Sequence, residues 1–344
     1  MSRRARLATL TAALALAAAL ALAHAALAAA PAPEFIIKLA TVAPADSPWS
    51  ALLEKYKTEV ETKSAGRVAV KLKLGGALGD ENETVLKCKR GTVEAVGAST
   101  GALASLVPEL NVVELPFLFE TGEQADYVID GVLTAKLDPL FKERGLVLGF
   151  WSENGFRHFG TKDKFVKSPA DLKGKKMRSQ ESPVHMAMYR AFGASPVPIP
   201  TTEVPTALAT GSVDGFDQSA LYTIAASWHK SIKYFTVTGH IYQPAAIAFN
   251  KEFFEKLPPE LQKLLIDEGR AIQSKGRKGV RKIFPDLLKI LRDDGVEVYT
   301  LTPAERVPFV TASRVVYDEF RKTHGKVASA LLDDVLKSLK TAPK

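Results

Sequence analysis

The feature that most constrains the fold is a regular alternation of short β-rich runs with amphipathic helical segments after about residue 30. Phe35 to Val42 and Arg67 to Leu74 are predicted strands, each followed by a segment with apolar residues at helical spacing. Ser47 is the expected N-cap of the first helix and Pro48 its first residue, and a second helix is expected from about Asp80 to Arg90. Such alternation predicts an α/β sheet.

A second set of strands and helices begins near Phe156. Lys175 to Arg178 and Val213 to Phe216 are predicted as short strands, with a helix from Ser182 to Gly193 between them. From Pro258 onward the pattern is mainly helical. Two α/β units in one chain predict a ligand cleft between them, because ligands of open α/β sheets bind beyond the carboxyl ends of the strands.

A basic and then apolar leader precedes this region. Arg3, Arg4 and Arg6 stand before an almost unbroken Ala/Leu run, which ends in small residues up to Ala30. This order is typical of a secretory signal peptide, so residues 1–30 are predicted to be removed and the mature protein to be soluble in the periplasm. A retained membrane anchor is the alternative, but Pro31-Ala32-Pro33 follows in place of a stop-transfer flank. The export route, Sec or twin-arginine, and the cleavage site stay open.

Charge and motifs argue against several classes of function. The formal charge is +8, but no basic tract gathers it into the footprint that nucleic-acid binding needs. The sequence has no Gly-x-Ser-x-Gly, no His-Glu-x-x-His and no phosphate-binding loop, so we expect neither an enzyme nor a cofactor. The histidines beyond the leader lack metal-ligand spacing, and the sequence leaves open whether a metal ion assists binding.

Arg178 is the strongest candidate for binding an anion. It ends a predicted strand, and its guanidinium offers a rigid fork of donors that matches a carboxylate. Arg157 begins another predicted strand, and Asp217 and Gln218 follow the strand that ends at Phe216. Asp217 is interpreted as a ligand of a metal ion, an acceptor for a ligand hydroxyl, or the partner of Arg157. Taken alone, each of these residues is more often structural than functional.

The order of several short motifs resembles the solute-binding subunits of tripartite ATP-independent periplasmic (TRAP) transporters, the dicarboxylate-binding-protein family. The similarity covers nearly the whole mature chain. The motifs are Ala43 to Pro48, Leu78 to Asp80, Ser168 to Arg178, Phe192 to Pro198, Glu203 to Gly211, Val213 to Gly215, Thr238 to His240 and Leu257 to Glu260.

The resemblance implies two α/β domains with a ligand cleft between them, joined by crossing strands and a long hinge-spanning helix. Domain I is expected to comprise residues 33–155 plus 241–281, and domain II residues 156–240 plus 282–344. Closure around the ligand would be a hinge motion.

The resemblance also implies the site. Arg178 stands where the family's arginine clamps a ligand carboxylate, and Arg157 stands where a second arginine assists. Gln218 replaces a common Asn, and Phe216 replaces a polar residue, which indicates an apolar pocket for the ligand's tail. Together with Asp217, these are the predicted ligand-binding residues.

The function implied by the resemblance is capture of a small organic acid and its delivery to the membrane permease, by a protein that is expected to act as a monomer. One alternative is an accessory protein that presents ligand to a sensor. Another is a binder of larger apolar or aromatic acids, held partly by Phe216 and Trp228. The identity of the acid is left open.

Overall fold

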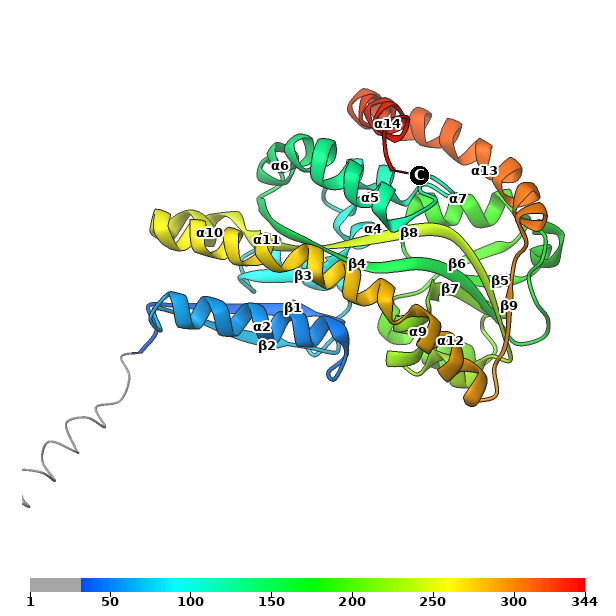
Figure 1. Cartoon of the computed structure of the whole chain (residues 1–344), viewed down its shortest axis with the longest axis horizontal. Coiled ribbons are helices and arrows are strands. Elements are labelled where there is room, and N and C mark those ends of the chain that lie inside the picture. Colours follow the sequence, from blue (N-terminus) through cyan, green and yellow to red (C-terminus); the bar gives the residue numbers. More distant parts are fainter. Residues whose placement is uncertain (1–31, 344) are drawn as a thin grey trace, which may run out of the picture.

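A computed structural model describes residues 32–343, so the predicted signal peptide lies outside the described residues. The strands form one mixed sheet in the order β2-β1-β3-β8-β4-β7-β5-β6, with β9 paired to β8 (Figure 1). Their bounds are β1 (Phe35–Thr41), β2 (Val68–Lys73), β3 (Ala95–Ser99), β4 (Leu146–Thr161), β5 (Lys176–Ser179), β6 (Ser195–Pro198), β7 (Gly215–Ser219), β8 (Tyr234–Asn250) and β9 (Glu297–Thr300).

Helices pack around the sheet, and the predicted helix start at Ser47 is confirmed. Ser47 caps the first helix, with Pro48 as its first residue, and Thr302 forms a capping box with Glu305 at another. The α-helices are α2 (Pro48–Lys63), α3 (Glu81–Lys89), α4 (Thr100–Leu103), α5 (Gly122–Val128), α6 (Thr134–Glu143), α7 (Pro183–Ala191), α8 (Val204–Ala209), α9 (Ala220–Ala225), α10 (Lys251–Lys256), α11 (Pro259–Lys282), α12 (Phe284–Asp293), α13 (Pro303–Thr323) and α14 (Gly325–Leu339).

Two long antiparallel strands, β4 and β8, cross the whole molecule and join its two halves (Figure 1). The parallel pairs of β1 with β2 and β3 lie on one side of them, and the parallel pairs of β5 with β6 and β7 lie on the other. Phe156, expected near the start of a strand, lies well inside β4. The β4–β8 register shifts between Leu148 and Phe150, Glu153 and Gly155, and Arg157 and Phe159.

The strand predicted from Val213 to Phe216 is displaced toward the carboxyl end. The observed strand β7 pairs residue by residue with β4, from Gly215 opposite Thr161 to Ser219 opposite Arg157. Asp217 and Gln218 therefore lie within this strand and not after it, because pairing with the long neighbouring strand extends the ladder past the apolar run.

The long helix α11 runs along β4 and the first helix α2 (Figure 1). Its buried residues include Leu261, Leu265, Gly269 and Ile272 on one face, as expected for an amphipathic helix on a sheet. Gly269 lets the helix approach the sheet closely, since a Cβ there would lie 2.0 Å from Cδ1 of Phe150. Between residues 32 and 343, we find no helix with the length and apolar character of a membrane span.

Two glycines of α11 provide a matched test of this packing. A Cβ at Gly279 would meet nothing within 4 Å, so Gly279→Ala is expected to stabilise the protein by up to about 1 kcal/mol through helix propensity. Gly269→Ala is expected to destabilise it by about 1–3 kcal/mol, because the buried Phe150 ring must move. Urea unfolding of both variants measures the difference, and equal stability would contradict the close helix–sheet contact.

Candidate functional site

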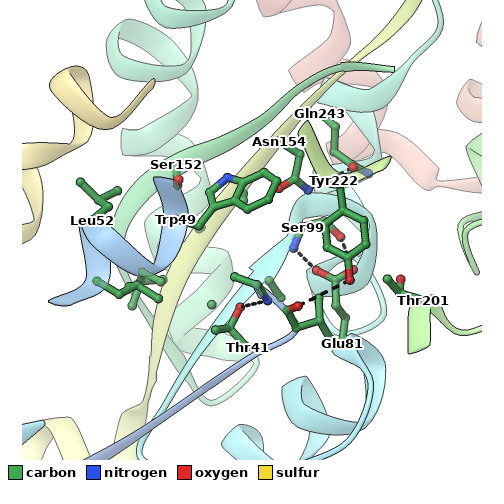
Figure 2. Close-up of a pocket in the computed structure, with 18 of the residues that line it drawn as sticks. Thr41, Trp49, Leu52, Glu81, Ser99, Ser152, Asn154, Thr201, Tyr222 and Gln243 are labelled. Atoms are coloured by element: carbon green, nitrogen blue, oxygen red, sulfur yellow. Dashed lines mark hydrogen bonds between the residues drawn. The ribbon is translucent and has the colours of Figure 1, made fainter. Parts of the chain in front are cut away.

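A cavity of about 50 Å³ lies where strands of the two halves of the sheet end. The residues that line it come from the ends of β1, β3 and β7, from the middle of β4 and β8, from the segments after β5 and β6, and from the helices α2, α3 and α9 (Figure 2). The polar residues among them are Thr41, Glu81, Ser99, Ser152, Asn154, Gln180, Thr201, Gln218, Tyr222 and Gln243. The cavity is thus at the position that the strand pattern predicts for a ligand.

Arg178 lies in β5 beside this cavity and is 1 % exposed. Its Nε and Nη2 donate to the carbonyl oxygen of Ile199 at 3.0 and 2.8 Å, and Nη2 donates to Oγ1 of Thr201 at 3.3 Å. Within residues 32–343 no carboxylate forms a salt bridge with it, and its Nη1 makes no hydrogen bond. Burial and then the charge of Arg157 lower the pKa of Arg178 to about 10. The side chain is therefore a buried cation that neutral acceptors hold in place.

An aromatic pair supports this guanidinium. The Arg178 guanidinium carbon lies 5.3 Å from the centroid of the Trp228 ring, and Phe216 packs edge-on against the same indole at 5.1 Å. Phe216 and Trp228 are 0 % and 1 % exposed, and neither lines the cavity. Phe216 therefore contributes to the packing beneath Arg178, and the cavity wall consists of other residues.

Arg157 lies in β4, and each nitrogen of its guanidinium donates to a protein group. Its Nε donates to Oδ2 of Asp217 at 2.5 Å, and both side chains are completely buried. Its Nη2 donates to the Asp217 carbonyl, and its Nη1 donates to Oε1 of Gln243 at 2.8 Å and to Oε1 of Gln218 at 3.2 Å. The sequence left three interpretations of Asp217, and the structure gives it Arg157 as partner.

Asp217 joins further buried groups from the second half of the chain. Its Oδ1 accepts from the hydroxyl of Tyr189 at 2.8 Å, and its Oδ2 lies 3.3 Å from Nε2 of His240. Burial alone would raise the pKa of Asp217, but Arg157 and the hydrogen bond from His240 outweigh it and hold that pKa well below its usual value. Asp217 is consequently an anion that fixes Arg157.

A chain of hydrogen bonds continues from Arg157 across the cavity to Glu81. The amide of Gln243 donates to Oε1 of Gln180 at 2.7 Å, and the amide of Gln180 donates to Oγ of Ser99 at 2.7 Å. Ser99 in turn donates to Glu81 through its backbone N–H at 2.7 Å and through Oγ at 2.9 Å (Figure 2). These four residues line the cavity, so one continuous polar network forms much of its wall.

A second buried carboxylate, that of Glu114, is hydrogen-bonded to this network. Glu114 accepts from the Nε2 donor of Gln243 at 3.0 Å and contacts Nε2 of His185 and the hydroxyl of Thr100. Burial would raise the pKa of Glu114, but the hydrogen bond and the charge of His185 outweigh it and lower that pKa. The orientation of the Gln243 amide is thereby fixed from both ends, by Arg157 and by Glu114.

The predicted site residues are thus brought together in space, with different relations to the cavity. Gln218 lines it, whereas Arg178, Arg157, Asp217 and Phe216 lie immediately behind the lining residues. The lining residues that the sequence did not indicate include Glu81, Ser99, Gln180, Tyr222, Gln243 and Trp49. One signal was present, because Gln243 is a polar residue in an otherwise apolar part of β8.

Metal binding has little support in this part of the molecule. Across residues 32–343, no three side chains of His, Cys, Asp or Glu are grouped so that they could hold a metal ion. Asp217, which the sequence left open as a metal ligand, is surrounded by Arg157, Tyr189 and His240.

Comparison with known proteins agrees with the family resemblance of the sequence. The family described as "Bacterial extracellular solute-binding protein, family 7" matches residues 39–323. A solute-binding protein of Verminephrobacter eiseniae is 37 % identical over 80 % of this chain and 82 % of its own length. The 2,3-diketo-L-gulonate-binding periplasmic protein of Escherichia coli is 31 % identical over 72 % of this chain and 75 % of its own length.

Solved structures with bound acids have the same fold. A TRAP periplasmic solute-binding protein of Ralstonia eutropha with bound (S)-2-acetolactate superimposes with a TM-score of 0.84, at 26 % identity over 89 % of this chain and 99 % of its own. The sugar-acid-binding protein of Advenella mimigardefordensis in complex with galactonate also gives a TM-score of 0.84, at 28 % identity and the same coverage. The expected two-domain α/β binding-protein fold is confirmed.

Glu81 gives the site a pH dependence that can be measured. Burial, followed by the charge of Asp80, raises the pKa of Glu81 to about 7 from an unfolded value of 4.5. The stability that its neutral form contributes is fully present below pH 4.5 and is lost as the pH rises to about 7. Relative to the wild type, Glu81→Gln is therefore expected to gain about 3 kcal/mol of unfolding free energy between pH 4 and pH 8, at roughly 1.4 kcal/mol per pKa unit.

Urea unfolding at both pH values measures this gain. Glu83→Gln, on an exposed position of the same helix, is the control for removing one negative charge. A difference between Glu81→Gln and the wild type that stays constant with pH would contradict a carboxyl group held neutral at the site.

Proposed function

The chain belongs to family 7 of the bacterial extracellular solute-binding proteins, the solute-binding subunits of TRAP transporters, and on that premise we propose that Arg178 binds the carboxylate of its ligand. The protein captures a small organic acid in the cleft between its two domains. It then delivers the acid to the membrane permease of the transporter. The comparisons support the binding of acids, and the role of Arg178 is our inference from its environment.

The observation that carries the proposal is the missing counter-ion of Arg178. A fully buried cation with no paired anion is costly, since desolvation is not repaid by a nearby opposite charge. Arg157, equally buried, has Asp217 at 2.5 Å. Arg178 has only neutral acceptors within hydrogen-bonding distance, and its bond to Thr201 connects it to the cavity wall. A ligand carboxylate would supply the missing charge in a site with little water.

The remaining wall of the cavity favours an acid that carries further oxygen atoms. The lining includes the carboxyl group of Glu81, the hydroxyls of Thr201 and Tyr222, and the amides of Asn154 and Gln218. These groups suit hydroxyl and carbonyl oxygens next to a carboxylate. 2-Acetolactate, galactonate and 2,3-diketogulonate, the acids of the three relatives described above, each carry such an oxygen at C2. We therefore propose a 2-hydroxy or 2-oxo acid as ligand.

The other predicted residues take supporting roles in this proposal. Arg157 holds Asp217, Gln218 and Gln243 in fixed orientations, and Gln218 contacts the ligand directly. Phe216 packs edge-on against Trp228 and so holds the indole ring against the guanidinium of Arg178. Neither Phe216 nor Trp228 lines the cavity, so an apolar part of the ligand would instead meet the apolar lining residues, among them Val42, Trp49, Leu53 and Ile247.

The family supports a proposal for the location and the partners of the protein. We propose a periplasmic protein that works without catalysis, that releases its acid to a membrane permease and that acts as a monomer without nucleic acid. Presentation of the ligand to a sensor remains the alternative function. Uptake of the acid by cells that carry the permease genes, with and without this protein, separates the two.

Arg178→Gln tests the anchor. Loss of one partner of a buried charged pair costs about 2–5 kcal/mol, so the variant should bind the acid at least roughly thirtyfold more weakly. The ligand is first found by native mass spectrometry of the purified protein and by thermal-shift screening of 2-acetolactate, galactonate and their uncharged analogues. Isothermal titration calorimetry then gives the dissociation constants.

Arg190→Gln is the matched control, because Arg190 pairs with Glu319 on the exposed surface and lies outside the site. It should leave the affinity unchanged. An Arg178→Gln protein that unfolds like the wild type and binds the acid with the same affinity would overturn the assignment.

A further inference from the structure

A second and larger cavity lies behind the crossing strands, away from the acid-binding cavity. Its volume is about 410 Å³, within the range of small-molecule sites. Neighbouring residues of one strand point into different cavities: Ser152 lines the first and Glu153 the second, and Gln218 lines the first and Ser219 the second. The rear cavity, as we call the second one, therefore lies mainly on the opposite face of the sheet, and Asn154 lines both cavities.

The rear cavity has mainly apolar walls. They are formed by side chains from β4, β8, α9, the junction of α11 with α12, and the segment that leads into α13. The apolar residues are Phe156, Leu221, Val237, Val280, Phe284, Leu287 and Leu301. A ligand of this cavity would thus bury a hydrocarbon or aromatic part.

Arg306 supplies a positive charge with free donors at this cavity. Its Nη1 donates to the carbonyl oxygen of Thr238, and its guanidinium lies over the ring of Phe117 at 4.9 Å. Within residues 32–343 its Nε and Nη2 make no hydrogen bond, and no carboxylate lies within salt-bridge distance. Arg281, the other arginine of the cavity, is already paired with Asp126 and Glu153.

His158 adds a neutral donor that has no partner. Its Nδ1 accepts from the backbone N–H groups of Thr238 at 3.2 Å and Gly239 at 3.0 Å, so the neutral ring carries its proton on Nε2. This Nε2 is buried and has no hydrogen-bond partner, although His158 lines the cavity. An unsatisfied buried donor costs about 1–3 kcal/mol, which an acceptor atom of a ligand would recover.

The remaining charges around the cavity limit the kind of ligand. Glu120 and Glu123 lie at its exposed rim, and Glu153 is paired with Arg281. A cationic ligand could pair only with these carboxylates, which are exposed to solvent or already paired. An anion gains the free donors of Arg306 and the Nε2–H of His158, and its apolar part gains the hydrocarbon wall.

We propose that the rear cavity is a second ligand site for a small monocarboxylate with an apolar body, whose carboxylate accepts from Arg306 and His158. Arg178 is not part of this site. An aryl-alkanoic acid such as 4-phenylbutanoate has the required charge and size.

Calorimetric titration with 4-phenylbutanoate tests the proposal. The wild type should bind it, and 4-phenylbutan-1-ol, which lacks the charge, should bind at least tenfold more weakly. Arg306→Gln should weaken binding of the acid at least tenfold, whereas Arg306→Lys, which keeps the charge, should weaken it less. Arg314→Gln, on an exposed position of the same helix, is the matched control and should bind like the wild type.

Arg178→Gln separates this site from the transport site. It should leave 4-phenylbutanoate binding unchanged, even if it also leaves binding of the transported acid unchanged and so overturns the first proposal. The rear site is refuted by any of three results: no binding of 4-phenylbutanoate at millimolar concentration, equal binding by a folded Arg306→Gln protein, or loss of binding in Arg178→Gln alone.

Discussion

The buried ion pair of Arg157 and Asp217 is the interaction on which the rest of the site depends. It joins β4 to β7, and its members bind Tyr189, His240, Gln218 and Gln243 in turn. Two charges in a dry interior are stable only if their remaining donors and acceptors are satisfied, and here protein groups satisfy nearly all of them. The pair therefore orients side chains on both sides of the cavity without contacting the cavity itself.

The two arginines of the site differ because only one of them has a counter-ion. Arg157 is neutralised within the protein and acts as a structural centre, whereas Arg178 is held by a carbonyl, a hydroxyl and an indole face. Arginine tolerates this environment better than lysine, since it keeps its proton even where burial lowers its pKa. A permanent cation without a partner is what reversible binding of an acid requires, and a permanent internal partner would compete with the ligand.

Much of this arrangement could be predicted from the sequence, and the remainder depends on long-range pairing. The strand–helix alternation and the caps at Ser47 and Thr302 are local signals, and they correspond to the observed elements. The extent of β7 could not be predicted from the local sequence, because its last residues form a strand only through their pairing with β4. Glu81, Gln180 and Gln243 lie far apart in the chain, and each looks like an ordinary polar residue. Only the fold connects them into one hydrogen-bonded network.

The two cavities and the irregularities of the crossing strands are linked by geometry. The β4–β8 register shifts near Glu153 and Arg157, and Gly155 and Gly239 both have positive φ, at 91° and 56°. Backbone at such points is less tightly tied to its neighbour, so β4 and β8 are expected to bend there when the domains move. The cavity proposed to bind the acid lies on one side of this bend and the rear cavity on the other. Because a bend that opens one side compresses the other, occupancy of the two cavities should be thermodynamically coupled, and by reciprocity each ligand would then alter the affinity for the other.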